Sequence, residues 1–168
     1  LFKRYGSNIN SDENKLIVAV SKAVQYMAKR RIGALIVFEK NTGLQDYIET
    51  GIPMNSNISQ ELLTNVFIPN TPLHDGAMII QENKIASAAC YLPLSDSAKI
   101  AKSLGTRHRA AVGISEVSDA FTVIVSEETG SISVTFDGKL RKDISTEAFE
   151  ELLAEHWFGS HLQQKGVK

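Results

Sequence analysis

The tripeptide Arg107-His108-Arg109 is the most conspicuous group of side chains that could do chemistry. Two guanidinium groups flank an imidazole where Thr106 is expected to cap a helix, and helix N-termini favour anions through their free N–H groups and their dipole. Because successive helical residues are rotated by about 100°, the three side chains spread over a wide arc that suits a chain of phosphates. Taken alone, these residues also fit a solvated basic turn.

The segment His74-Asp75-Gly76 places a carboxylate beside a glycine, directly before the apolar run Ala77 to Ile80. Gly76 would let ligand atoms approach the backbone, and His74 could serve as a metal ligand or an acid–base group. Asp-Gly is also a common turn dipeptide. An ordinary turn with a structural histidine is therefore the alternative interpretation.

Two acidic residues, Glu127 and Glu128, follow the β-branched segment Thr122 to Ser126. One of them could supply oxygen to a divalent cation bound to phosphates, although a hairpin tip of this composition is usually only solvated. Cys90 is the single cysteine and stands in an apolar run, which indicates a buried side chain and excludes an intramolecular disulfide. The sequence lacks the glycine-rich nucleotide-binding loops and the zincin and hydrolase motifs.

These groups need a scaffold, and the sequence predicts helices and strands in alternation. Helices are expected where capping residues precede apolar residues at helical spacing: from Asn10 or Ser11 to Arg31, over 59–67, from Ser95 or Ser97 to Leu104, from Thr106 onward, and from Thr146 to Phe158. Strands are expected at 32–38, 44–52, 77–80, 85–92, 122–126 and 131–136. The first two strands and the next two are each expected to form a hairpin. We therefore expect an α/β fold, a single globular domain whose central mixed β-sheet is flanked by helices on both faces.

The composition agrees with one globular domain. The 168 residues are 43% hydrophobic and 22% charged, which excludes a disordered or low-complexity chain. Lys and Arg number 18 against 19 for Asp and Glu, so a general nucleic-acid binder is excluded and any anion site must be local. No run approaches the about 18 apolar residues of a membrane span, so the chain as given is expected to be soluble. Its start at Leu1 without a signal-peptide pattern indicates a piece of a longer protein.

Three segments, taken in order, resemble the diadenylate cyclase (DAC) domain family. The segments that carry its Asp-Gly-Ala and Arg-His-Arg motifs and their surroundings are Leu73 to Ala77, Gly105 to Ala111 and Val125 to Gly130. The resemblance runs from the first helix to the last strand, and it implies the DAC-domain fold, with a catalytic domain over 1–158 and a polar tail over 159–168. The segment 70–75 and the basic start Lys3-Arg4 are most similar to the membrane-anchored bacterial branch of the family.

The resemblance implies a reaction in which two ATP molecules condense to cyclic di-AMP and two pyrophosphates. Each ribose 3′-OH would attack the α-phosphate of the other ATP across a homodimer. Asp75 would lie near the 3′-OH and help activate it, while Gly76 and Ala77 would shape the nucleotide site. The other implied contacts are those of Thr106, Arg107, His108 and Arg109 with phosphates, Tyr91 and Leu92 with adenine, Ser126 with the phosphate side, and Glu128 with a metal.

The implied metal site would use His74, Asp75 and Glu128. Phosphoryl transfer needs an in-line nucleophile and neutralised charge, so a carboxylate, a metal and two arginines would suffice. A nitrogen ligand from His74 would favour Mn²⁺ or Co²⁺ over Mg²⁺. The resemblance further implies a cytoplasmic domain of a parent protein that reaches the cell membrane only through segments outside this chain.

Two other classes of function stay open. A non-catalytic module could sense ATP or a cyclic dinucleotide without converting it, but Asp75 disfavours this function because pure binding has little need of a carboxylate beside polyanionic phosphates. A purely structural interaction domain would leave two arginines at a helix start unexplained.

Overall fold

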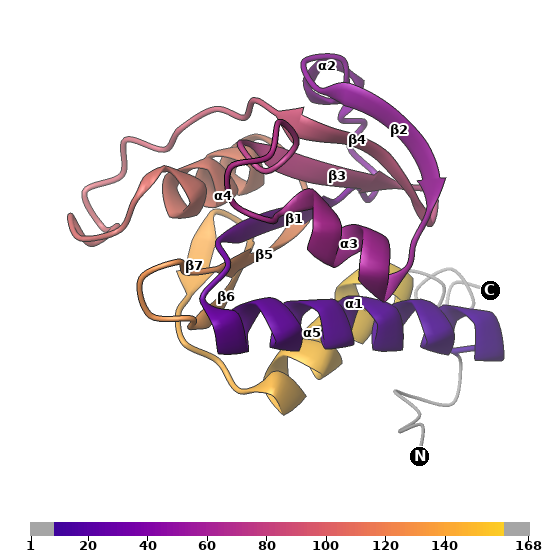
Figure 1. Cartoon of the computed structure of the whole chain (residues 1–168). Helices are drawn as coiled ribbons and strands as arrows, with labels where there is room; N and C mark the ends of the chain where they lie inside the picture. Colours follow the sequence, from indigo (N-terminus) through magenta and orange to yellow (C-terminus); the bar gives the residue numbers. More distant parts are fainter. Residues whose placement is uncertain (1–8, 160–168) are drawn as a thin grey trace, which may run out of the picture.

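The computed structural model describes residues 9–159, and within them the chain forms one seven-stranded sheet between two layers of helices (Figure 1). The helices are α1 (Ser11–Arg30), α2 (Gln45–Ile48), α3 (Gln60–Val66), α4 (Thr106–Val117) and α5 (Thr146–Phe158). The strands are β1 (Ala34–Phe38), β2 (Ile52–Asn57), β3 (Ala77–Gln81), β4 (Lys84–Cys90), β5 (Phe121–Val125), β6 (Ile132–Phe136) and β7 (Lys139–Arg141). Their order is β2-β4-β3-β1-β5-β6-β7, in which β1 and β3 run parallel and the other neighbours antiparallel.

The central strand β1 is buried over its whole length and divides the interior into two cores. Ile36 and Phe38 enter the core beneath α1, whereas Leu35 and Val37 enter the core beneath α4. A strand covered on both faces reads as a continuous apolar run, and this is why the sequence predicted it.

The two helical layers complete the expected class of fold. Helix α1 packs against α3 and α5 on one face of the sheet, while α4 packs against β5 and β6 on the other, with α2 beyond the end of β4 (Figure 1). Helix α1 begins where Asn10 Oδ1 accepts a hydrogen bond from the Glu13 N–H at 2.8 Å, and it ends at Arg30, before Arg31 in the left-handed region. The predicted mixed sheet with helices on both faces is therefore confirmed. Within residues 9–159, no helix combines the length and the apolar character needed to cross a membrane.

The expected hairpin between the first two strands is wrong. Strand β1 pairs with β3 and β5 instead, and Gln45–Ile48 is the helical turn α2. The carboxylate of Asp119 accepts hydrogen bonds from the backbone N–H groups of Asn41 and Thr42 at 3.0 and 2.9 Å, and Leu44 is buried in the core beneath α4. These long-range contacts stabilise the segment more than a hairpin turn would. The strand β2 therefore begins later in the sequence, at Ile52, and pairs with β4 at the edge of the sheet.

The helix expected over 95–104 is also wrong, because this segment is irregular. The backbone N–H of Ser95 donates to the carbonyl oxygen of Arg109 at 3.0 Å, which ties the segment to α4. Ile100 is buried, but the segment has no stripe of apolar residues that a helix could bury.

The other predicted elements lie close to their observed positions. The hairpin of β3 and β4, the helix α3, the strands β5 and β6 and the last helix are all confirmed. Helix α4 differs by one residue at its start, because Gly105 is its N-cap and Thr106 is its first helical residue. Lys3-Arg4 and the tail after Gly159 lie outside the described residues.

Candidate active site

Asp75 is held where the start of β3 comes close to the end of β4. Gly76 next to it has φ +113°, and a Cβ at this position would lie 2.8 Å from the carbonyl carbon of Ala89 and from the oxygen of Cys90. Glycine is the residue that tolerates both the positive φ and the close approach. Ala77 is buried and pairs with Cys90, so Asp75 stands at the end of the sheet.

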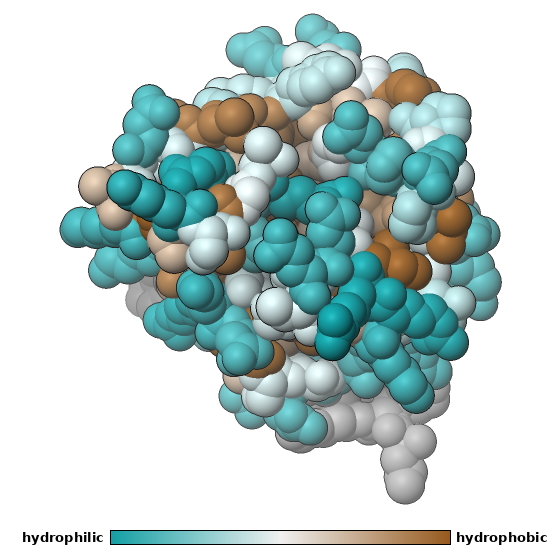
Figure 2. Space-filling model, turned by 60° about the vertical axis from the view of Figure 1, so that its left-hand side comes forward, coloured by the Kyte–Doolittle hydropathy of each residue, from teal (hydrophilic) through white to brown (hydrophobic). Residues whose placement is uncertain are grey.

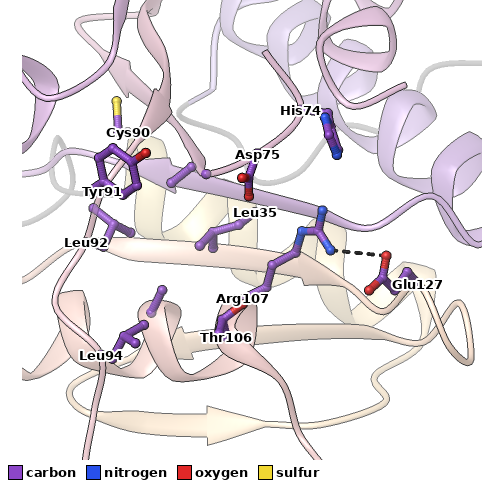
Figure 3. Close-up of a pocket in the computed structure, with 13 residues that line it drawn as sticks. Leu35, His74, Asp75, Cys90, Tyr91, Leu92, Leu94, Thr106, Arg107 and Glu127 are labelled. Carbon is purple, nitrogen blue, oxygen red and sulfur yellow. Dashed lines mark ion pairs between the residues drawn. The ribbon is translucent and has the colours of Figure 1, made fainter. Parts of the chain in front are cut away.

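A cavity of about 540 Å³ opens beside Asp75 (Figure 3). Its walls come from β1, the start of β3, the end of β4, the start of α4 and the β5–β6 turn. The lining residues are Leu35, His74, Asp75, Gly76, Ala77, Cys90, Tyr91, Leu92, Leu94, Thr106, Arg107, Ala110 and Glu127. Figure 3 shows the Asp75 carboxylate and the Arg107 guanidinium reaching into the same space, with Tyr91 and Leu92 along one wall. The fold thus brings together a carboxylate and a cation from distant segments, in a cavity of the size that binds small ligands.

A second cavity of about 170 Å³ adjoins the first and shares Thr106, Arg107 and Glu127 with it. The further lining residues are Ser103, Leu104, Gly105, His108, Val125, Ser126 and Glu128. The first turn of α4 has no capping side chain and no acidic residue, so its N–H groups and dipole remain available to an anion in this cavity. His108, Ser126 and Glu128, all predicted from the sequence, therefore lie on the side of the smaller cavity.

Arg107 is incompletely paired within its own chain. Its Nη1 lies 3.5 Å from Oε2 of Glu127, and the Glu127 side chain is 69% exposed. Such a solvated ion pair contributes little to stability. The Nε atom of Arg107 is buried and has no hydrogen-bond partner. The guanidinium therefore keeps hydrogen-bond donors available for an anionic ligand.

His108 belongs to the first turn of α4, and its side chain is buried. Burial, then the nearby charges of Lys142 and Arg107, lowers the pKa of His108 below its usual range, while Glu128 acts in the opposite direction. A lowered pKa keeps the imidazole neutral near pH 7. His108 can thus offer a hydrogen bond to a ligand in the smaller cavity, and the positive charge there comes from the arginine.

His74 has one ring nitrogen occupied and one available. Its Nδ1 lies 2.5 Å from the carbonyl oxygen of Thr71, which accepts the N–H hydrogen bond and leaves the Nε2 lone pair available. Metal-binding histidines are commonly oriented in this way. Within residues 9–159 there is no group of three His, Cys, Asp or Glu side chains that could hold a metal ion, so His74, Asp75 and Glu128 do not form one in a single chain. A divalent cation bound by His74 and Asp75 would need further oxygens from its ligand and from water.

Arg109 lines neither cavity. Its Nη1 donates a hydrogen bond to the carbonyl oxygen of Ser95 at 3.4 Å, and its own carbonyl oxygen accepts one from the Ser95 N–H. A Cβ on Gly113, one turn further along α4, would collide with the carbonyl oxygen of Pro93. Arg109 binds the segment after β4, and Gly113 leaves space for that segment to lie close to α4. The same segment carries Tyr91 and other apolar residues of the cavity wall.

Sequence reasoning missed several apolar lining residues, namely Leu35, Leu94 and Ala110. Each belongs to an apolar or helical pattern that signals packing, and nothing in a single sequence separates a core position from a cavity wall. Cys90 was predicted to be buried, which is confirmed, and burial raises the pKa of its thiol. The hydrogen bond between its Sγ and the Ser87 hydroxyl, at 2.8 Å, acts on this pKa in the opposite direction, but burial has the larger effect and favours the unreactive thiol form.

The mouth of the larger cavity is apolar and open to solvent. Tyr91 is 74% exposed and Leu94 is 53% exposed, although both line the cavity. Figure 2, in which the side bearing α4 comes forward, shows a mainly hydrophilic surface interrupted by separate hydrophobic patches. Large apolar side chains exposed beside a binding cavity favour contact with a ligand or a second chain.

Comparison with known proteins agrees with this geometry. The family model for DAC, described as DisA bacterial checkpoint controller nucleotide-binding, matches residues 10–140. The chain belongs to the DAC family. The cyclic di-AMP synthase CdaA of Bacillus subtilis is 60% identical to this DAC domain over 152 residues, which are 90% of this chain and 56% of that protein. A diadenylate cyclase of Listeria monocytogenes is 61% identical over 153 residues, which are 91% of this chain and 56% of that protein. The chain thus spans a little over half the length of these relatives.

Solved structures that share the fold include a close and a more distant relative. A crystal structure of a double mutant of DacA from Staphylococcus aureus matches this DAC domain with a TM-score of 0.89 and 86% identity, covering 89% of this chain and 100% of that one. A hypothetical membrane spanning protein from Bacillus cereus matches with a TM-score of 0.74 and 42% identity, covering 84% of this chain and 67% of that one. These matches confirm the expected DAC-domain fold.

Proposed function

We propose that this DAC domain condenses two ATP molecules into cyclic di-AMP and releases two pyrophosphates. The observation that carries the proposal is the convergence of Asp75 and Arg107 on one cavity beside the start of α4. The names of the relatives, cyclic di-AMP synthase and diadenylate cyclase, support the same reaction. In each half-reaction a new bond forms between a ribose 3′-oxygen and an α-phosphorus, and the bond to the bridging oxygen of pyrophosphate breaks.

Asp75 is the proposed acceptor of the 3′-OH proton. A carboxylate at the wall of the cavity can accept a hydrogen bond from the hydroxyl and raise the electron density on its oxygen. Gly76 and Ala77 leave the cavity floor without bulky side chains, so a ribose can approach the backbone. The leaving pyrophosphate takes the electron pair of the broken bond and carries its negative charge away.

The phosphate chain would extend from Arg107 toward the smaller cavity. Thr106 and His108 on the first turn of α4 can donate hydrogen bonds to phosphate oxygens, and the uncapped helix start adds its dipole. Ser126 offers a hydroxyl on the opposite wall. Positioning and charge stabilisation are the main demands of phosphoryl transfer, and this set of donors meets both.

Tyr91 and Leu92 would line the adenine pocket. Both residues follow β4 directly and form part of the wall of the larger cavity, and the apolar Leu35 and Ala110 also line that cavity. An aromatic ring and aliphatic side chains suit the flat faces of a purine. The adenine would then lie at the apolar end of the cavity and the phosphates at its basic end.

His74 and Asp75 fit a divalent cation on the substrate side, and Glu128 remains a proposed ligand beside the smaller cavity. A bound cation would neutralise the negative charge of the phosphates. Because His74 offers a nitrogen, Mn²⁺ and Co²⁺ would be preferred over the oxygen-seeking Mg²⁺.

The reaction requires two domains. The larger cavity suits one nucleotide, and each 3′-OH must reach the α-phosphate of the other ATP, so two cavities must face each other in a homodimer. The exposed Tyr91 and Leu94 at the cavity mouth support such a contact. A longer protein attached to the membrane agrees with the description of the Bacillus cereus relative as membrane spanning.

The experiment is product analysis. The domain is incubated with ATP and Mn²⁺, and the products are separated by chromatography and identified by mass. We expect one cyclic di-AMP for every two pyrophosphates. ATP that binds but is recovered unchanged at high protein concentration would favour the non-catalytic nucleotide sensor.

A further inference from the structure

Gly33 lies in the short connection between α1 and β1, beneath the guanidinium of Arg107. A Cβ built on Gly33 would collide with Nη1 of Arg107 and lie 2.7 Å from its Cζ. The same Cβ would lie 3.2 Å from Cβ of Glu127, the ion-pair partner of that arginine. The backbone at position 33 therefore forms the surface on which the Arg107–Glu127 pair rests.

A glycine is needed at this position because there is no room for a side chain, and not because of the backbone conformation. Gly33 is absent from the residues with positive φ, a group that includes Gly76, Gly130 and Gly138. An alanine could adopt its backbone without strain. The missing side chain at position 33 thus serves one observable purpose, which is to admit the arginine.

We propose that Gly33 is a positioning residue for Arg107 in the reaction of this DAC domain. The proposal rests on the proposed function, in which Arg107 binds the phosphates of ATP. Without a side chain at position 33, the guanidinium lies against the backbone, within 3.5 Å of Glu127, and faces the larger cavity. Any larger residue at this position would push the guanidinium away from where it lies.

The two atoms that would lie within 3.0 Å of this Cβ, Nη1 and Cζ of Arg107, belong to the far end of a flexible side chain, and Cβ of Glu127 at 3.2 Å would need to shift by only a few tenths of an ångström. A Cβ on Gly51 or Gly130 would instead meet backbone oxygen atoms, which cannot move without disturbing the fold. Arg107 can change rotamer, so Gly33→Ala should fold normally and place the guanidinium elsewhere. Phosphoryl transfer is sensitive to a displacement of about 1 Å, which can lower the rate by about 100-fold. The structure therefore predicts a defect in catalysis that is separate from stability.

The test compares Gly33→Ala with Gly43→Ala. Gly43 is a matched control because a Cβ there meets no atom within 4 Å and its φ is not positive. For each variant the thermal midpoint, the Kd for ATP, and the kcat and KM for cyclic di-AMP formation are measured. We expect Gly33→Ala to keep the wild-type midpoint and to lose about 100-fold in kcat/KM, while Gly43→Ala stays within about twofold of the wild type. Equal kinetics in the two variants would overturn the proposal.

A double variant shows whether the effect acts through the arginine. In an Arg107→Ala background the collision is gone, so adding Gly33→Ala should cause no further loss of ATP affinity or rate. If Gly33→Ala alone melts early, the double variant should regain the midpoint of Arg107→Ala. Independent losses, or lasting instability in the double variant, would contradict the role of Gly33. A wild-type domain that makes no cyclic di-AMP at high protein concentration would refute the proposed function instead, and the ATP affinities would still test Gly33.

Discussion

At the scale of single residues, the site is defined by side chains whose hydrogen-bonding atoms are not all paired within the chain and can therefore bind a ligand. Arg107 has a buried Nε without a partner and one solvated ion pair, and His74 keeps one ring nitrogen available. Burial lowers the pKa of His108, which favours its neutral form. Each of these groups could bind part of a nucleotide without first breaking a strong contact within the chain.

Arg109 and Arg107 have different contacts, so replacing each of them with alanine should change ligand affinity in a different way. Because Arg109 donates to the Ser95 carbonyl, Arg109→Ala should loosen the cavity wall and weaken binding of adenosine and ATP by the same factor, about tenfold. Arg107→Ala is the matched control and should weaken ATP while leaving adenosine almost unchanged. Calorimetric titration of both ligands checks this. A loss confined to ATP in Arg109→Ala would assign Arg109 to the phosphates, as the resemblance implied.

His74 should determine which metal supports the reaction. The wild type is expected to be about tenfold more active with Mn²⁺ than with Mg²⁺ at equal concentration, because its available ligand is an imidazole nitrogen. His74→Ala should bring the two activities together by lowering the Mn²⁺ rate. Initial rates over a concentration series of each metal would measure the ratio. An unchanged ratio would remove His74 from the metal site.

At the scale of elements, the site depends on contacts between segments that are far apart in the sequence. The motif residues could be recognised because their chemistry follows from neighbouring residues alone. A carboxylate beside a glycine, and arginines at a helix start, each indicate a type of ligand contact. The hairpin expected after β1 failed because Asp119 holds that loop from a distance. The contact of Arg109 with phosphate, which the resemblance implies, stays a prediction, while its hydrogen bond to Ser95 depends on a chain segment whose path one sequence does not reveal.

Helix α5 packs on the sheet through a histidine that should make stability depend on pH. The ring of His156 contacts those of Phe121 and Phe136, with centroids 4.8 and 4.4 Å away, and its Nδ1 is 3.4 Å from the Lys40 ammonium. Burial, then Lys40, lowers its pKa below the usual range; the other charged groups that act on it are Glu155, Asp137 and Arg141.

The sign of the pH effect follows from that lowered pKa. The unfolded chain binds the proton more tightly, so the stability contributed by neutral His156 is fully present above about pH 6.5 and is lost as the pH falls toward the folded-state pKa. His156→Phe keeps an aromatic ring in contact with the two phenylalanines and removes the titration. Urea unfolding at pH 7.5 and 5.5 should show a smaller loss of stability in His156→Phe than in the wild type. An equal loss in both would mean that His156 does not contribute to the pH dependence.

At the scale of the whole molecule, one domain supplies half of the proposed reaction. Its larger cavity has walls from both sides of the sheet centre, yet its mouth leaves Tyr91 and Leu94 exposed. The rate of cyclic di-AMP formation should therefore rise with the square of protein concentration while monomers predominate, and linearly once dimers form. A dilution series at saturating ATP, with the mass of the species measured by light scattering, would test this. A rate proportional to protein throughout the monomeric range would contradict the two-domain reaction.

The central claim is that Asp75 and Arg107 act on the same bound ATP. The most direct measurement is the rate of cyclic di-AMP formation by Asp75→Asn at saturating ATP, with ATP affinity measured in the same sample. Asparagine keeps the shape of the side chain but cannot accept the 3′-OH proton as a carboxylate does. We predict an ATP affinity within about threefold of the wild type and a rate at least about 100-fold lower. Cyclic di-AMP formation at the wild-type rate would show that the carboxylate takes no part in the reaction.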